Sequence, residues 1–193
     1  MIKQLVVASV ILLGINLNAA AALKEGELAP NFNVQASLNG KAFSYSLQDA
    51  LKKGPVVIYF YPSAFTNGCN VQAHTFATNH EKFTSAGASI IGVSLDSINR
   101  LNQFSADPNY CAGKIPVASD VNGSIAKSYD LTIKEAVSGK KDTRGIDIDH
   151  GFIERTTFIV TPSRKIVAVL GGLSPTENVD KALQTVQRIT SNH

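Results

Sequence analysis

One of the two cysteines in the chain, Cys69, stands where a thiol could react. It follows an apolar segment at residues 56–61 (VVIYFY) and a loop that begins at Pro62, and it falls in the first turn of a helix predicted from about Asn67. The first N–H groups of a helix have no intrahelical partner and the helix dipole is positive there, so negative charge is favoured. The pattern therefore predicts a nucleophilic thiolate at Cys69, with the hydroxyl of Thr66 beside the sulfur. A buried, inert cysteine is the alternative.

Strands and helices alternate around Cys69. Two apolar, β-rich segments at residues 56–61 and 88–95 have the pattern of strands that are covered on both faces. Apolar residues between them recur at helical spacing over residues 67–85, before Gly87. A second helix is expected from Asp96-Ser97, which would cap it, to about residue 104.

The flanking segments complete an α/β pattern. The predicted elements are strands at 31–36 and around 43–45, a helix at 46–53, a strand at 115–119, a helix after Asn122-Gly123, a hairpin at 156–161 and 165–170, and a last helix after the capping box at 174–177. Residues 133–150 are polar and charged and are expected to form a long loop. This order predicts a thioredoxin-like α/β sandwich of three layers with a mixed central sheet.

Three segments resemble the peroxiredoxins, most closely their bacterioferritin-comigratory or Q-type branch. Pro62, Thr66 and Cys69 match the Pro-x-x-x-Thr-x-x-Cys motif of that family. Residues 27–32 (ELAPNF) resemble its entry segment, and residues 151–159 (GFIERTTFI) are similar to the segment that holds its active-site arginine, here Arg155. The resemblance covers nearly all of the chain after the N-terminal segment, and it implies a thiol peroxidase.

The resemblance also implies a mechanism and partners. The thiolate of Cys69 would attack hydrogen peroxide or an organic hydroperoxide and become a sulfenic acid. Backbone N–H groups, the Thr66 hydroxyl and the Arg155 guanidinium would stabilise charge on the leaving oxygen, and Pro62 would shield the site. A thioredoxin-like or other dithiol reductant would restore the thiol, and no cofactor is expected. The alternative for Arg155 is a surface ion pair on a strand, and for Pro62 a strand terminator.

The second cysteine has a less certain role. Many Q-type members carry a resolving cysteine five residues after the first, where this chain has His74. Cys111 is therefore the candidate resolving residue, and it would form an intramolecular disulfide with Cys69 after local unwinding. A permanent structural disulfide and a single-cysteine enzyme remain alternatives. Two positions depart from the family pattern, Asn67 for Pro and Gln72 for Glu, and both are expected to affect loop stiffness more than chemistry.

Composition excludes several other classes of protein. With 18 Lys and Arg against 15 Asp and Glu among 193 residues and no basic run, nothing points to a nucleic-acid partner. Two cysteines cannot form a disulfide scaffold or a four-thiolate zinc site. His74 and His80 would largely point to different helix faces, so no metal site is expected. The alternative function is an exported thioredoxin-fold thiol or copper carrier, which the lack of Cys-x-x-x-Cys and Cys-x-x-Cys disfavours.

The N-terminus has the pattern of a secretory signal peptide. Lys3 precedes an apolar run at residues 5–14, which is too short to span a membrane, and alanines follow at 19–22. We expect residues 1–22 to be removed and residues 23–193 to form one domain, in a bacterial periplasm or secreted, with no membrane contact after cleavage. It is expected to be a monomer or weak dimer.

Overall fold

The computed structural model describes residues 22–191, so the expected signal peptide lies outside the described residues except for Ala22. Within this range, no helix combines the length and apolar character needed to cross a membrane.

A mixed sheet of seven strands runs through the protein in the order β2-β1-β5-β4-β3-β8-β9. The strands are β1 (Asn33–Leu38), β2 (Lys41–Ser46), β3 (Val56–Phe60), β4 (Ser89–Ser94), β5 (Val117–Ser119), β8 (Thr156–Val160) and β9 (Ile166–Gly171). The pairs β3–β4 and β4–β5 are parallel, and the other neighbours are antiparallel. This confirms the predicted thioredoxin-like sandwich with a mixed central sheet.

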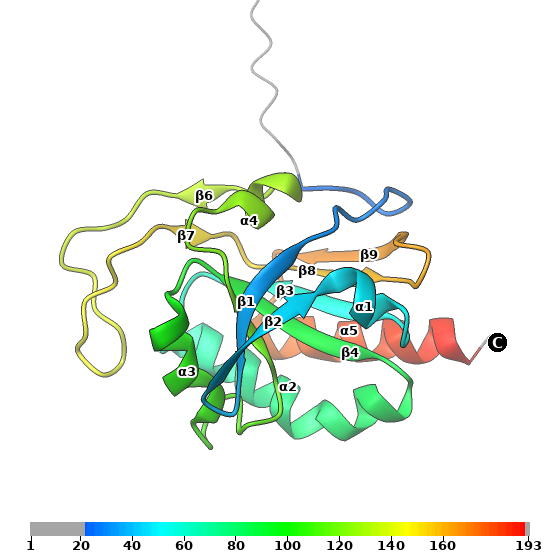
Figure 1. Cartoon of the computed structure of the whole chain (residues 1–193), viewed down its shortest axis with the longest axis horizontal. Helices are drawn as coiled ribbons and strands as arrows, with labels where there is room; N and C mark the ends of the chain where they lie inside the picture. The colour runs from blue at the N-terminus through cyan, green and yellow to red at the C-terminus, as the bar shows by residue number, and fades with distance from the viewer. Residues whose placement is uncertain (1–21, 192–193) are drawn as a thin grey trace, which may run out of the picture.

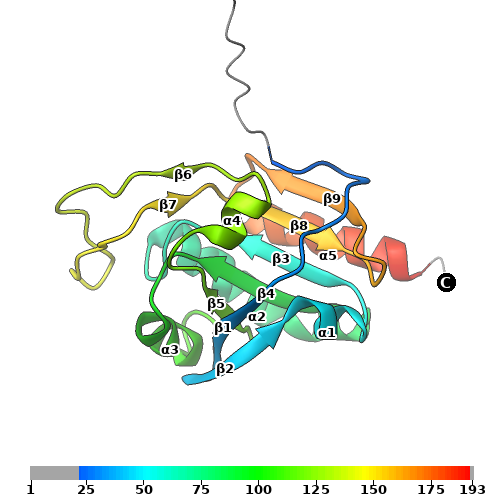
Figure 2. The same cartoon turned by 45° about the horizontal axis from the view of Figure 1, so that its top comes forward.

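Helices cover both faces of the sheet and make three layers. The helices are α1 (Leu47–Leu51), α2 (Asn67–Ser85), α3 (Ile98–Ala106), α4 (Ser124–Ser128) and α5 (Pro175–Thr190). Helices α1 and α4 lie on one face, and α2 and α5 lie on the other (Figures 1 and 2). Every residue of β3 is buried, with Val57 and Tyr59 packed toward α2 and α5 and with Val56 and Ile58 packed toward α1 and α4.

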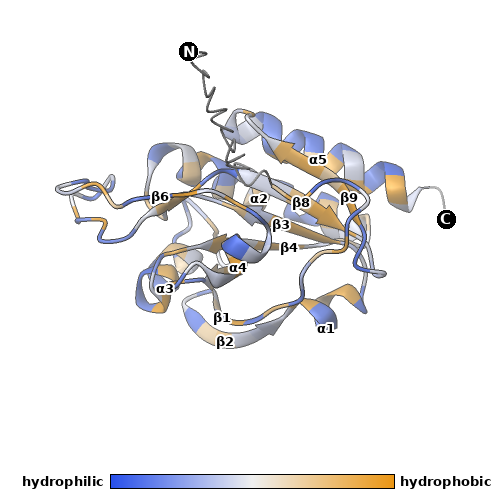
Figure 3. Ribbon diagram, turned by 90° about the horizontal axis from the view of Figure 1, so that it is seen from above, coloured by the Kyte–Doolittle hydropathy of each residue, from blue (hydrophilic) through white to orange (hydrophobic). Residues whose placement is uncertain are grey.

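The apolar pattern of the sequence explains these layers. The central strands are predominantly apolar, whereas the helices alternate between apolar and polar residues (Figure 3). A strand inside a sheet that is covered on both faces has no solvent-facing side, so its residues are apolar without alternation. Helix α5 begins at the predicted capping box, where the Oγ atom of Ser174 accepts a hydrogen bond from the N–H of Glu177 at 3.3 Å.

Residues 133–153 form an arm that extends from the sandwich (Figure 1). Its base is a two-stranded antiparallel sheet of β6 (Ile133–Lys134) and β7 (Phe152–Ile153). The prediction of one long loop over 133–150 was therefore wrong at its start, where two residues are paired to a strand that the sequence pattern did not reveal. The arm also contributes a buried apolar side chain, Ile148, and a buried carboxylate, Asp142.

Candidate active site

The register of the sheet brings three distant segments to the end of β3. Phe60, the last residue of β3, pairs with Thr156 at the start of antiparallel β8 and with Val93 near the end of parallel β4. Residue 155 therefore lies beside the loop that follows β3, and so does the segment after β4 that contains Asp96. The same loop leads into α2, so its first turn faces both segments.

Cys69 lies in the first turn of α2, as predicted, and its side chain is 2% exposed. The Nη2 atom of Arg155 donates a hydrogen bond to the Sγ atom of Cys69 at 3.3 Å. The predicted pair is thus brought together, and Arg155 is not the surface ion pair on a strand that was the alternative. A guanidinium stays charged at any physiological pH, so a permanent positive charge and a helix N-terminus converge on the sulfur.

A glycine that sequence reasoning did not single out makes room for this contact. A Cβ atom at Gly68 would lie 3.2 Å from the Nη2 atom of Arg155 and 3.5 Å from the Cγ atom of Pro175. Any larger residue would therefore push against the guanidinium. The dipeptide Gly68-Cys69 at a predicted helix start was the only signal in the sequence that could have indicated such a close approach.

Thr66 and Pro62 lie at the two ends of the loop that connects β3 to α2. Thr66 is the N-cap residue of α2, and its hydroxyl donates to the carbonyl of Ser63 at 2.9 Å. The sequence predicted this hydroxyl beside the sulfur of Cys69. Within residues 22–191, the two groups are not hydrogen-bonded to each other. Pro62 directly follows β3 and is half-buried, which fits the strand-terminating reading of this proline.

The buried carboxylate of Asp96 holds the loop between β3 and α2 in place. Asp96 is fully buried, and its Oδ2 atom accepts from the N–H of Ala64 at 2.7 Å. Its Oδ1 atom accepts from the Ser63 hydroxyl at 3.0 Å and lies 2.9 Å from Nε2 of His150 and 2.8 Å from Nε of Arg100. Two residues of the loop between Pro62 and Thr66 are therefore tied to the end of β4.

The predicted cap of α3 at Asp96-Ser97 is confirmed at Ser97, whereas Asp96 does not cap the helix. Ser97 alone is the N-cap residue, and its Oγ atom accepts from the N–H of Arg100 at 3.4 Å. Burial would raise the pKa of Asp96, but the hydrogen bond and charge of His150 and the N–H of Ala64 hold it below its usual value. Asp96 is thus an ionised support of the loop.

His150, at the end of the arm, belongs to the same cluster. Its Nδ1 atom lies 2.7 Å from the carbonyl oxygen of Gly151, and its Nε2 atom faces Asp96. Both ring nitrogens therefore face acceptors, which favours the doubly protonated ring. Burial lowers the pKa of His150, but the hydrogen bond and charge of Asp96 outweigh it, so the pKa is raised.

Phe65 connects the loop to the arm. It is buried with a positive φ of 59°, a conformation that is unusual for a bulky residue. The guanidinium carbon of Arg144 lies 3.3 Å from the centre of its ring, and the N–H of Thr143 donates to its carbonyl at 2.9 Å. Asp142 forms ion pairs with Arg144 at 2.9 Å and with Arg100 at 2.8 Å, which fasten the arm beside the loop.

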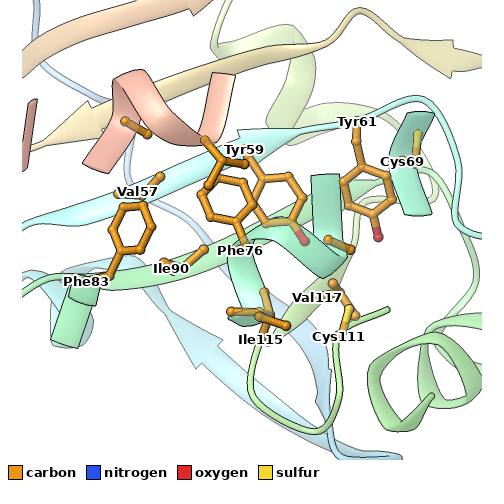
Figure 4. Close-up of a cluster of buried hydrophobic side chains, with 14 of the residues drawn as sticks. Val57, Tyr59, Tyr61, Cys69, Phe76, Phe83, Ile90, Cys111, Ile115 and Val117 are labelled. Atoms are coloured by element: carbon orange, nitrogen blue, oxygen red, sulfur yellow. The ribbon is translucent and has the colours of Figure 1, made fainter. Parts of the chain in front are cut away.

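Cys111 lies in the segment after α3, as predicted, and is 0% exposed. Both cysteines are free, so the permanent disulfide is absent from this structure. They belong to one buried cluster, in which the ring of Tyr61 is drawn between them (Figure 4). Burial, and secondarily the charge of Asp107, raise the pKa of the Cys111 thiol well above its usual value. Cys111 becomes a reactive thiolate only if this segment opens.

The histidines of α2 lie apart from the sulfur. His74 is exposed, and its Nδ1 atom lies 3.1 Å from the carbonyl oxygen of Asn109 in the segment that carries Cys111. His80 is half-buried, and burial lowers its pKa. Within residues 22–191, no three His, Cys, Asp or Glu side chains gather as a metal site would require.

The fold and this site define a thioredoxin-like protein with a cysteine at a helix start, and solved structures that resemble it include peroxiredoxins. Peroxidoxin BcpB of Mycobacterium tuberculosis superposes with a TM-score of 0.71 at 28% identity, covering 86% of this chain and 98% of that one. The bacterioferritin comigratory protein of Xanthomonas campestris gives 0.64 at 26% identity, covering 81% and 92%.

Sequence comparison agrees with the structural comparison. The profile of the AhpC/TSA family matches residues 26–169, and the chain belongs to this family: it is a peroxiredoxin, a peroxidase. Its relatives include the chloroplastic 2-Cys peroxiredoxin BAS1 of Hordeum vulgare, 28% identical over 169 residues (85% of this chain, 74% of that protein). Peroxiredoxin Bcp of Xanthomonas campestris is 34% identical over 112 residues (58% and 63%). Relatives named 2-Cys peroxiredoxin and relatives named Bcp both match, so the assignment of this chain to the Q-type branch stays a prediction.

Proposed function

We propose that Cys69 is the residue that reduces peroxide and that Arg155 is its main electrostatic partner. The observation that carries this proposal is the hydrogen bond from Arg155 Nη2 to Cys69 Sγ at 3.3 Å, at the N-terminus of α2. A cation that lies at the sulfur stabilises the thiolate before the reaction and the departing oxygen during it.

The reaction is a displacement on oxygen. The thiolate of Cys69 attacks the terminal oxygen of the peroxide, an S–O bond forms, and the O–O bond breaks. The leaving oxygen takes the negative charge, which the guanidinium of Arg155 stabilises. It then takes a proton to become water or an alcohol. Cys69 is left as a sulfenic acid, two electrons more oxidised than the thiol.

We further propose that Cys111 resolves this sulfenic acid. Its sulfur would displace water and form an intramolecular disulfide with Cys69, and a thioredoxin-like or other dithiol reductant would restore both thiols. Support comes from the shared buried cluster and from the segment after Cys111, where Ala112 and Gly113 both have positive φ. Because Cys111 is buried, local opening must precede this step. A single-cysteine enzyme is the alternative.

The test is the reaction of the reduced protein, residues 23–193, with hydrogen peroxide, followed by thiol loss and by mass. We expect Cys69→Ser to abolish peroxide consumption, whereas Cys111→Ser should still gain one oxygen atom at residue 69. A thiol or copper carrier would consume peroxide no faster than free cysteine does, and that result would overturn the proposal.

We propose export as the setting of this reaction, on the basis of the signal-peptide pattern at residues 1–22. The mature domain would then work in the periplasm or outside the cell, as a monomer or weak dimer. Expression of the full chain followed by cell fractionation and N-terminal sequencing tests this. Retention of residues 1–22 on a cytoplasmic protein would contradict it.

A further inference from the structure

Arg155 is held at Cys69 by a neutral side chain. Its Nη1 atom donates a hydrogen bond to the Oε1 atom of Gln72, one turn further along α2. None of the ion pairs among residues 22–191 includes Arg155. The positive charge of the guanidinium is therefore not shared with a carboxylate of the described chain.

The direction of this hydrogen bond is determined by a chain of amide contacts that begins at a backbone carbonyl. Leu170 O can only accept, so the atom of Asn178 that lies 3.0 Å from it must be Nδ2. The Oδ1 atom of Asn178 then faces the other way and accepts from Gln72 Nε2 at 3.0 Å and from Thr157 Oγ1 at 2.7 Å. Gln72 is left with Oε1 toward Arg155.

Burial holds this series of hydrogen bonds in one arrangement. Gln72 and Asn178 are both 0% exposed, so water does not offer either amide a substitute partner. Rotating the amide of Gln72 would place its NH₂ group against a guanidinium that can only donate. One orientation of Gln72 alone satisfies both neighbours, and it presents an acceptor to Arg155 Nη1 while Nη2 points at the sulfur.

We propose that Gln72 and Asn178 are positioning residues that aim Arg155 at Cys69 and, because they are neutral, leave its positive charge to the thiolate and the departing oxygen. This inference rests on the proposed function of Cys69 and adds two residues that act through Arg155. The replacement of the family's Glu by Gln72 then affects the chemistry, contrary to the expectation that it affects loop stiffness.

A carboxylate at position 72 would disturb this series of hydrogen bonds in two ways. In Gln72→Glu, one carboxylate oxygen would pair with Arg155 and share its charge, and the other would face the Oδ1 atom of Asn178, acceptor against acceptor. Both effects weaken the stabilisation of a negative charge on Cys69. Gln72→Met adds no buried charge, but it removes both the acceptor for Arg155 and the donor to Asn178, so it tests the aiming of Arg155 apart from the effect of charge.

The first readout does not depend on peroxide. Alkylation of residue 69 by iodoacetamide, followed by peptide mass mapping across pH, reports the thiolate. We expect the midpoint of this profile to rise by about one pH unit in Gln72→Glu, which corresponds to a roughly tenfold slower reaction below the midpoint. Asn79→Asp places the same amide-to-acid change two turns further along α2 and should leave the midpoint unchanged.

The second readout is the rate constant with hydrogen peroxide at a pH above each midpoint. We expect losses of about tenfold or more in Gln72→Met and Asn178→Leu, because Arg155 loses its aim in both. Folded Gln72→Glu protein with an unshifted alkylation midpoint, or folded Gln72→Met and Asn178→Leu proteins with wild-type rate constants, would overturn the positioning roles. A wild-type protein that fails to react with peroxide would instead overturn the proposed function, while a shifted alkylation midpoint would still support the positioning roles.

Discussion

The Nη2 atom of Arg155 lies 3.3 Å from the Sγ atom of Cys69, although 86 positions separate the two residues in the chain. The antiparallel pairing of Phe60 with Thr156 produces this contact, because it places the start of β8 beside the loop after β3. The sheet therefore provides the geometry, and the first turn of α2 provides the thiol. A substitution at Arg155 should change the chemistry while the fold persists.

Arg155→Met should lower the rate constant of Cys69 oxidation by peroxide by about a hundredfold to a thousandfold, the usual cost of removing one donor to a developing negative charge. Arg155→Lys should recover only part of this loss, since a point charge replaces a planar fork. Stopped-flow measurement of thiol oxidation checks both variants. Arg188→Met, on the exposed side of α5, is the control and should match the wild type.

Cys111→Ser should permit one rapid oxidation of Cys69 and then stop. The sulfenic acid would persist, because the thiol that condenses with it is gone, and a dimedone-type probe, a cyclic 1,3-diketone, should label residue 69. Mass spectrometry after one equivalent of peroxide checks this. If turnover with a dithiol reductant continues at the wild-type rate, Cys111 is not the resolving residue and the single-cysteine alternative holds.

His150 should make the stability of the protein depend on pH. Its pKa is raised above the ordinary value of 6.5, because Asp96 outweighs the effect of burial. The folded protein therefore binds the proton more tightly than the unfolded chain, so this stabilisation is complete below pH 6.5 and is lost as pH rises through the folded pKa. The difference in unfolding free energy between wild type and His150→Asn, measured in urea, should shrink from acid to alkaline pH.

His80 serves as a control of opposite sign. Burial lowers its pKa, so its contribution is present above pH 6.5 and is lost as pH falls. The difference between wild type and His80→Asn should therefore not shrink as pH rises. Equal pH dependence in the two variants would contradict the assignment of the raised pKa to the contact with Asp96.

Asp142→Asn should release the arm. This carboxylate pairs with Arg100 and Arg144, and breaking a buried ion pair by removing one partner commonly costs about 3–5 kcal/mol. Limited trypsin digestion should cleave the arm faster in this variant. Asp147→Asn removes a carboxylate of the same arm whose ion pair with Lys141 is solvent-exposed, so its effect should stay within about 1 kcal/mol. Similar digestion rates for both variants would contradict the role of Asp142.

The elements that local sequence determines were predicted well. Helix α2 spans Asn67–Ser85, as the apolar spacing and the following Gly87 indicated, and α5 begins at its capping box. These signals lie within a few residues of the feature that they specify. The position of Cys69 in the first turn of α2 followed for the same reason.

The surroundings of the site could not be predicted because they depend on long-range packing. Gln72 and Asn178 are 106 positions apart, and Ser63 and His150 are 87 apart. No local pattern relates such pairs. Asp96 shows why local patterns are insufficient here. An acidic residue before Ser97 suits a helix cap. The parallel register of β3 and β4 instead brings its side chain to the loop after β3, where it accepts a hydrogen bond from the N–H of Ala64.

The complete burial of Cys111 has a kinetic consequence for survival in peroxide. In the proposed cycle, in which Cys111 resolves the sulfenic acid on Cys69, that acid persists while the segment stays closed, and a second peroxide molecule can convert it to the sulfinic acid, which a dithiol reductant does not reverse. Tyr110, the neighbour of Cys111 in the chain, packs against the rings of Phe65 and Phe104, whose centres lie 5.6 and 5.3 Å away, and this packing opposes opening. In the proposed cycle, the packing of these three rings therefore contributes to the peroxide concentration at which the enzyme is inactivated.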